Sequence, residues 1–309
     1  MTNQEVAQHA AEETHAEGFN AGEVIIEHVS NSAIDHPLIH LPTVFGIDFS
    51  VTKHVLMLWL VAVVVFGVVT WTVRRYLRQD RPIPSGFMNA LEAVVEYVRD
   101  SIVLPNVGHR WVNTWTPLIL TFFVFILSAN AVGLIPIFEV VGLLDHWVLH
   151  TSEDSFAKNI MHGGATATGN FNVTAALATV TFFAIIIAGS RAHGFVKHWK
   201  NLVPHGLNPA IYVILIPVEL IGMFVRPFAL TMRLAANMTG GHIAILAILS
   251  FVFIFAESAG QTVGVAVGIG AVPMAALISA LEIIVVLVQA YVFTLLSAVF
   301  VGMAIHAHH

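Results

Sequence analysis

The sequence contains no cysteine and few charged residues. Without cysteine, neither a disulfide framework nor a thiolate metal site is possible. Charged residues make up 10% of the 309 residues, whereas 57% are hydrophobic and the mean hydropathy is +0.82. Soluble domains carry about 25% charged residues, so this composition indicates an integral membrane protein. The net charge of −6 comes with no basic tract, which argues against nucleic acid as a partner.

Lysine and arginine are absent from the first 18 residues, which contain several acids. A secretory signal or an organelle transit peptide would be positively charged here. We therefore expect residues 1–50 to form a polar tail of the mature protein, followed by a single membrane domain over residues 51–309.

Five apolar runs are long enough to cross about 30 Å of hydrocarbon, which takes about 20 helical residues. We therefore expect an all-α membrane protein. The last two runs are too long for upright helices, since residues 208–255 would span roughly 70 Å as one helix. Either this run folds into a hairpin or it crosses at a steep tilt, and the sequence leaves both open. The predicted spans are residues 54–73, 116–138, 173–190, 208–255 and 262–305.

Lysine and arginine in the short loops predict the orientation of the chain, because cytoplasmic loops are enriched in both. The loop after the first span, 74–82, holds four arginines, and the loop after the third, 191–200, holds one arginine and two lysines. The connection between the second and third spans holds four acids and one lysine. We therefore expect the N-terminal tail and this acidic loop on the outer side, and the C-terminus in the cytoplasm.

Residues 83–103 follow a different pattern. Apolar residues recur at helical spacing, with Glu92, Glu96 and Arg99 on the other side. This pattern predicts an amphipathic helix at the inner membrane interface. A solvated connector helix that packs on protein fits the pattern equally well.

Charged residues interrupt the last two apolar runs at Glu219, Arg226, Arg233 and Glu282. A charge at mid-bilayer costs at least about 2.5–3.5 kcal/mol on insertion scales. Such residues either face a bundle interior, a partner or a water-filled cavity, or they lie near a helix end and reach the headgroups. Long apolar sequence follows Arg233, which favours the first alternative for this residue.

One polar stripe is predicted around Arg233. At about 100° per residue, Glu219, Arg226 and Asn237 all lie within ~40° of it on one helix. A self-contained channel or transporter would need a carboxylate for Arg233 on this stripe. Glu219 is the strongest candidate, but it lies ~20 Å away along a straight helix. Arg233 is therefore left to meet something outside the chain.

A second polar face is predicted to join the last two runs. His242 lies about half a turn from the Arg233 stripe, and Glu282 and Gln289 share one face. The simplest assembly places His242 against Glu282 and Gln289. A histidine and a glutamate within hydrogen-bond distance can pass a proton near neutral pH. Arginine does not usefully release its proton, so Arg233 is suited to gate protons rather than to relay them.

The 17 histidines suggest a metal site at first sight. His146 and His150 have the i, i+4 spacing of ligands, but the glutamate of a zinc-binding HExxH helix is missing. We therefore expect no metal and no cofactor. An intramembrane hydrolase would need a nucleophile–base pair or a metal, and the sequence offers no such motif.

Three segments carry a specific resemblance to a known family: "SANAVGLIP" (128–136), "RPFALTMRLAANMTGGHIAI" (226–245) and "LEIIVVLVQAYVFTLLSAVF" (281–300). With its Arg-Leu-x-x-Asn pattern and the glutamine downstream, the chain resembles subunit a of F-type ATP synthases, the stator of the membrane motor. The resemblance implies two long, tilted C-terminal helices. It also implies a subunit without catalysis of its own, which conducts protons beside a ring of c subunits and b-type peripheral-stalk subunits in the bacterial inner membrane.

The resemblance further implies a role for each polar residue in the membrane. Arg233 would face the carboxylates of the c-ring between two offset half-channels, and Glu219 would line the inner half-channel. The outer half-channel would be lined by Asn130, Asn237, His242, Glu282 and Gln289.

Two departures from the family pattern matter. Some members have glutamate at the position of His242 and histidine at that of Glu282, and a reciprocal exchange is what an interacting pair tolerates. Some also have aspartate three residues after Asn130, where this chain has Gly133. The outer entrance then uses other groups, for which histidines and acids of the outer loop are candidates. Sodium as the coupling ion stays open, although the histidine favours protons.

Overall fold

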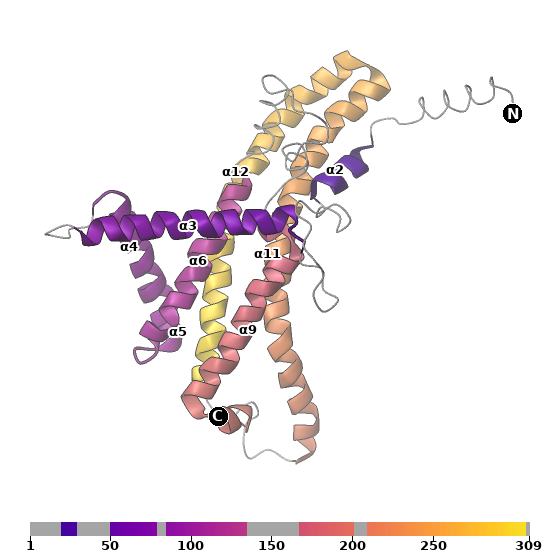
Figure 1. Ribbon diagram of the computed structural model, residues 1–309. Helices are drawn as coiled ribbons and strands as arrows, with labels where there is room; N and C mark the ends of the chain where they lie inside the picture. The colour runs from indigo at the N-terminus through magenta and orange to yellow at the C-terminus, as the bar shows by residue number, and fades with distance from the viewer. Residues whose placement is uncertain (1–19, 30–49, 79–84, 135–166, 201–208, 307–309) are drawn as a thin grey trace.

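The computed structural model of the chain describes residues 20–29, 50–78, 85–134, 167–200 and 209–306. Its elements in these ranges are all helical, which confirms the predicted fold class (Figure 1). Within them, five helices are long and apolar enough to cross a membrane. They are α3 (Lys53–Leu77), α6 (Val112–Leu134), α9 (Phe171–His193), α11 (Pro209–Ala259) and α12 (Gln261–Ile305).

The two C-terminal helices are each continuous. Helix α11 runs for 51 residues and α12 for 45, or roughly 76 and 68 Å at 1.5 Å per residue. Pro217 and Pro227 lie inside α11 without breaking it, so the hairpin alternative for residues 208–255 is wrong. Because both helices are more than twice as long as the hydrocarbon is thick, they fit a bilayer only at a steep tilt.

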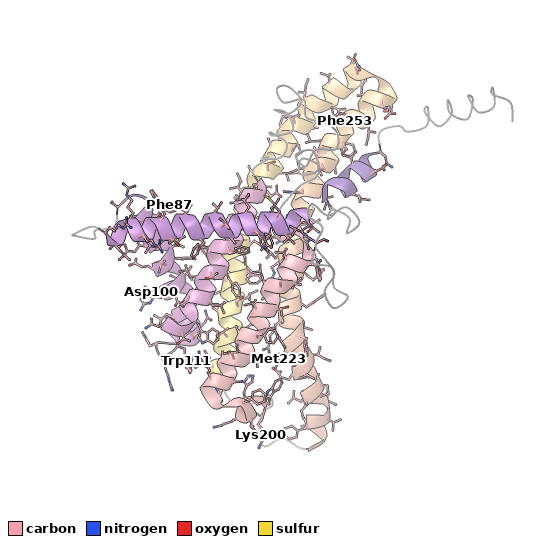
Figure 2. All side chains as sticks on the ribbon, in the orientation of Figure 1. Phe87, Asp100, Trp111, Lys200, Met223 and Phe253 are labelled. Carbon is pink, nitrogen blue, oxygen red and sulfur yellow. The ribbon has the colours of Figure 1, made fainter. Side chains whose placement is uncertain are left out.

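Helices α11 and α12 form an antiparallel hairpin that turns at Gly260, whose φ of 96° suits glycine. They stay in close contact along the hairpin, since a Cβ on Gly264 would lie 2.5 Å from the Cβ of Ala256. Apolar side chains project from the outer faces, as at Phe253 near the turn (Figure 2). Such faces fit lipid or a protein partner.

The core lies where α6, α9 and α12 meet. Phe122 of α6 and Phe293 of α12 pack edge to face with ring centroids 5.5 Å apart. Helix α3 lies across α6 and α9 at a steep angle (Figure 1) and is largely exposed. At 25 residues, or about 37 Å, α3 has the length of a nearly upright span, which agrees with steep tilts for the other helices.

The predicted amphipathic segment splits into two parts. Helix α4 (Phe87–Glu96) has no buried residue. It continues as a π-helical turn, η1 (Tyr97–Val103), and a short α5 (Leu104–Val107), whose apolar side chains are buried against α6 and α12. The second half is therefore a connector packed on protein, whereas the interfacial position of α4 stays a prediction.

The predicted N-terminal tail contains a helix, α2 (Ala21–Val29), which packs against α11. The backbone N–H of Glu23 donates to Asn20 Oδ1 at 3.3 Å, as in a helix N-cap. The division at residue 50 stays a prediction. The outer loop with His146 and His150, and the end of the second span beyond Leu134, lie outside the described residues.

Candidate functional site

Arg233 points away from the helix bundle. Leu230, Leu234 and Met238 of α11 recur at helical spacing and are buried. The opposite face of the helix therefore points outward. Arg233 lies on that outer face and is exposed, beside the exposed Met232 and Ala236. In the part of the chain that the structure describes, its guanidinium makes no hydrogen bond and no ion pair. A cation inside an apolar span without an internal partner is expected to meet a partner or water.

Glu219 pairs with Arg226 and not with Arg233. Arg226 Nη2 lies 3.2 Å from Glu219 Oε1, and both side chains are about one third exposed. The Arg226 guanidinium also lies 5.9 Å from the centroid of the Phe300 ring on α12. Within the predicted stripe, Glu219 and Arg226 therefore neutralise each other, whereas Arg233 has no such partner among the described residues. The carboxylate that a self-contained transporter would need at Arg233 is therefore engaged elsewhere.

His242 and Glu282 meet between α11 and α12. His242 Nδ1 lies 2.9 Å from Glu282 Oε1, within hydrogen-bond distance. The Glu282 side chain is 4% exposed and that of His242 is 24% exposed. The carboxylate is thus enclosed by protein, while the imidazole reaches the edge of the contact. This is the arrangement that a proton relay requires.

Gly241 makes the room that Glu282 occupies. A Cβ at position 241 would lie 2.5 Å from Glu282 Oε1, closer than real contacts allow. Helix α11 continues as one helix through Gly240 and Gly241. Glycine at position 241 allows the close approach of the Glu282 side chain.

Asn237 joins Gln289 across the same helix contact. Asn237 Nδ2 donates to Gln289 Oε1 at 2.9 Å, and Gln289 is buried. The helical projection placed Asn237 on the Arg233 stripe, and Asn237 is exposed there as Arg233 is, but its amide also reaches α12, which the projection did not predict. The two helices approach so closely at Gly241 that side chains on both flanks of the contact reach α12, which an angle around a single helix axis does not capture.

Asn130 belongs to a buried polar junction near the C-terminal end of α6. Its Oδ1 accepts from Thr168 of η3 (Ala167–Gly169), and Thr239 of α11 donates to the Gly169 carbonyl at 3.3 Å. Asn130 Nδ2 is buried and has no partner among the described residues. The turn η3 contacts α3, α6, α9 and α11. Sequence reasoning missed Thr168 and Thr239, because neither threonine shares a regular spacing with the other polar residues of the membrane region.

No group of three or more histidine, cysteine, aspartate or glutamate side chains in the described ranges is placed to hold a metal ion. These observations define the class of protein. The chain has five apolar spans, a buried histidine–glutamate pair and an exposed arginine within the longest span. The chain is a polytopic α-helical membrane protein with ionisable groups inside its spans, and such groups mark ion pathways in membrane proteins.

Comparison of the sequence with known proteins narrows this class of membrane protein to one family. A family model described as ATP synthase A chain matches residues 55–302. ATP synthase subunit a 2 of Chlorobium luteolum is 40% identical over 302 residues, which cover 95% of this chain and 79% of the relative. Subunit a of Chlorobium phaeobacteroides is 39% identical over 97% of this chain and 82% of its own length. Subunit a of Anaeromyxobacter dehalogenans is 35% identical over 98% and 77%.

The chain belongs to the ATP synthase A chain family. The resemblance noted in the sequence is thereby confirmed. The chain is a multi-pass subunit of the proton-translocating membrane sector of a bacterial ATP synthase, and catalysis of ATP formation resides in other subunits.

Proposed function

We propose that Arg233 separates two offset half-channels that serve carboxylates on a moving ring of c subunits. One observation carries the proposal: Arg233 is exposed on α11 without a partner among the described residues, about two and a half turns from the contact of His242 with the buried Glu282. The uncompensated cation fits a partner that brings its own negative charge. The buried pair fits a route that delivers protons to that partner.

The arginine acts as a gate because of its charge and its basicity. A ring carboxylate within ~4 Å of the guanidinium is favoured in its ionised form by about 4 kcal/mol at an effective dielectric constant near 20. It therefore releases its proton before it passes. Since arginine itself keeps its proton, no proton leaks directly from one half-channel to the other.

The outer half-channel runs along the polar contacts between α6, η3, α11 and α12. Asn130 and Thr168 lie at its outer part, and Thr239 connects η3 to α11 one turn before His242. His242 then exchanges protons with Glu282, and imidazole titrates near neutral pH. Asn237 and Gln289 hold the helices in register beside this pair.

The inner half-channel uses Glu219. Its side chain is 37% exposed at the surface of the chain, and the ion pair with Arg226 holds the carboxylate in place. The basic last turns of α3 and α9 support a cytoplasmic position for this side. The N-terminus then lies outside the bacterial inner membrane and the C-terminus in the cytoplasm, with b-type stalk subunits beside the chain.

The test is Arg233→Ala in the complete ATP synthase. Synthesis driven by an imposed proton gradient in membrane vesicles is expected to fall to background, because nothing separates the half-channels. Arg110→Ala, at an exposed arginine before α6, is the control and should retain synthesis. Normal coupled synthesis by Arg233→Ala, in complexes that still contain the c subunits, would exclude the gating role.

A further inference from the structure

An apolar groove lies between α3, α4 and α6, on the side of the molecule away from the α11–α12 contact. It has a volume of about 890 Å³. Its walls are apolar side chains from all three helices, among them Phe66, Val69 and Val73 of α3, Leu91 and Val95 of α4, and Val124 of α6. The groove has the size of a small-molecule site, and none of the polar pairs described above lies in it.

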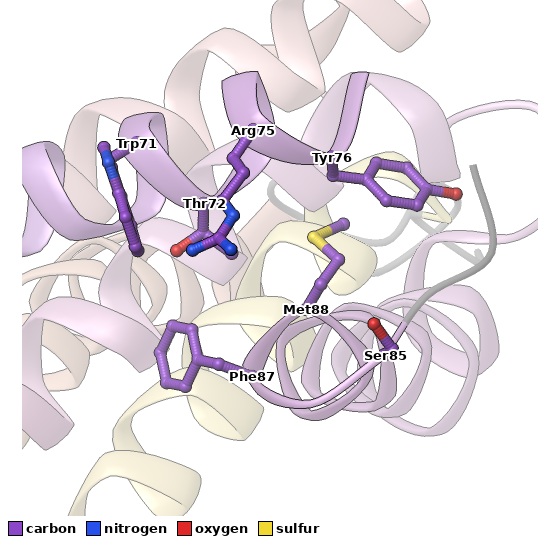
Figure 3. A pocket seen from close by; sticks show the side chains of 7 residues that line it. All are labelled: Trp71, Thr72, Arg75, Tyr76, Ser85, Phe87 and Met88. Atoms are coloured by element: carbon purple, nitrogen blue, oxygen red, sulfur yellow. The ribbon is translucent and has the colours of Figure 1, made fainter. Parts of the chain in front are cut away.

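A smaller, polar cavity of about 260 Å³ lies at the end of α3. Tyr76 and Met88 line both cavities, so the two adjoin each other. In the close view, Trp71, Thr72 and Arg75 extend from α3 toward Phe87 and Met88 of α4 (Figure 3). The combined site is therefore a long apolar slot with a polar, aromatic mouth.

Arg75 gives the mouth a positive charge. It is exposed, and within the described ranges its guanidinium forms no ion pair. It lies 5.4 Å from the centroid of the Trp71 ring, which holds it at the mouth. Ser85 adds a hydroxyl group on the opposite side. Guanidinium groups bind phosphate oxygens in bidentate fashion.

We propose that this site binds one glycerophospholipid, with its phosphate on Arg75 and an acyl chain along α3, α4 and α6. A cationic end and an apolar length match the two parts of such a lipid, and basic pockets between membrane helices bind headgroups. Tryptophan and tyrosine at the mouth are typical of headgroup depth.

Glu92 also lines the groove, one turn beyond Met88 on α4, and is half-buried. Because lipid phosphates lie at headgroup depth, Glu92 does not set how many phosphodiesters the lipid carries, and phosphatidylglycerol serves as the simplest anionic case.

The test uses the complete complex in liposomes that contain phosphatidylglycerol with a diazirine in one acyl chain. After irradiation, adducts located by mass spectrometry are expected on residues 62–73, 88–95 and 120–125. Arg75→Gln should lower their yield about tenfold, in keeping with the loss of a hydrogen-bonded charge contact. Arg74→Gln is the matched control, because Arg74 is the neighbouring exposed arginine and does not line the cavity.

A second variant tests the contribution of the apolar slot separately from that of the Arg75 charge. Val69→Trp fills the groove while Arg75 remains, and it should abolish the adducts in complexes that assemble normally. Three outcomes would overturn the proposal: no adducts on these segments in the unmodified chain, equal losses in Arg74→Gln and Arg75→Gln, or cross-links that place another subunit in the groove. Competition by added inorganic phosphate would also overturn it, because the site would then bind free phosphate.

Discussion

At the residue scale, the site combines one uncompensated charge with two compensated contacts. Arg226 is matched by Glu219, and Glu282 is matched by His242. Arg233 alone among these lacks a partner in the described part of the chain. An exposed ion pair contributes little to stability, so we attribute the Glu219–Arg226 contact to positioning. Because Arg226 is engaged by Glu219, Arg233 is the one of these two arginines that is available to an approaching carboxylate.

Exchange of the relay pair gives a sharp test at this scale. His242→Glu and Glu282→His should each slow proton flux by about 10² or more, because loss of a positioned acid or base typically costs that much. The double exchange restores a histidine–glutamate pair 2.9 Å apart in the original geometry. It should therefore conduct faster than either single variant. Proton flux through the membrane sector is the measurement, and a double variant no faster than the singles would refute a direct relay.

Gly241→Ala tests the position of the Glu282 carboxylate. The added methyl group would meet the flexible end of that side chain rather than backbone. The fold should therefore survive, while the carboxylate moves away from His242, and a shift of about 1 Å can cost up to 10²-fold in rate. Gly270→Ala on α12 is the control, since a Cβ there meets nothing within 4 Å. Equal proton flux in the two variants would show that Gly241 has no role in placing Glu282.

At the element scale, glycine sets how closely helices approach. A Cβ on Gly302 of α12 would lie 2.3 Å from the backbone oxygen of Asn106, and one on Gly189 of α9 would overlap the ring of His198. These contacts lock the connector α5 and the short helix α10 (Phe195–Lys200) onto the bundle. Unlike Gly241, both glycines serve packing, because the neighbours they accommodate are a backbone oxygen and a buried ring.

Docking of α10 on α9 is expected to depend on pH. His198 is buried, and burial, together with the nearby His193, lowers its pKa below the ordinary value of 6.5. When α10 leaves α9, the ring regains the ordinary pKa, so the undocked state binds more protons between the two values. Docking is therefore weakened as the pH falls through about 6.5 and below.

Hydrogen exchange of the α10 amides at pH 7.5 and 5.5, corrected for intrinsic rates, checks this expectation. Exchange should be faster at pH 5.5 in the unmodified chain. His198→Leu removes the titrating ring from the contact and should remove most of the difference. A difference that persists unchanged in His198→Leu would assign the effect to His193 or to another group.

At the scale of the whole molecule, two long helices present an outer face that the chain itself does not cover. Met232, Ala236 and Arg233 lie on this face of α11, and Leu277 and Leu281 are exposed on α12. In a membrane protein such an apolar face meets lipid or another subunit. We propose that a ring of c subunits slides over it, which accounts for the position there of Arg233, a cation without a partner among the described residues.

Because the chain has no cysteine, single cysteines can map this face without background. Met232→Cys lies on the outer face, where the side chain is 44% exposed. Paired with cysteines introduced into the c subunit, it should form disulfide cross-links upon mild oxidation. Leu234→Cys, at a fully buried position, should not. Cross-linking at Leu234 but not at Met232 would mean that the proposed ring contacts a different face.

The sequence by itself determined the all-helical membrane fold, the five apolar spans and the family to which the chain belongs. It could do so because burial in lipid demands long apolar helices and makes each charge within them conspicuous. The sequence could not determine that residues 208–255 form one helix, that Asn237 turns to Gln289, or that Glu219 pairs with Arg226. The contact of Asn237 was decided only by the tertiary structure, because it depends on how closely α11 and α12 approach at Gly241 and on which side chains reach across. The Glu219–Arg226 pair lies within α11, and the side-chain conformations that bring the two groups together have no signature in the sequence.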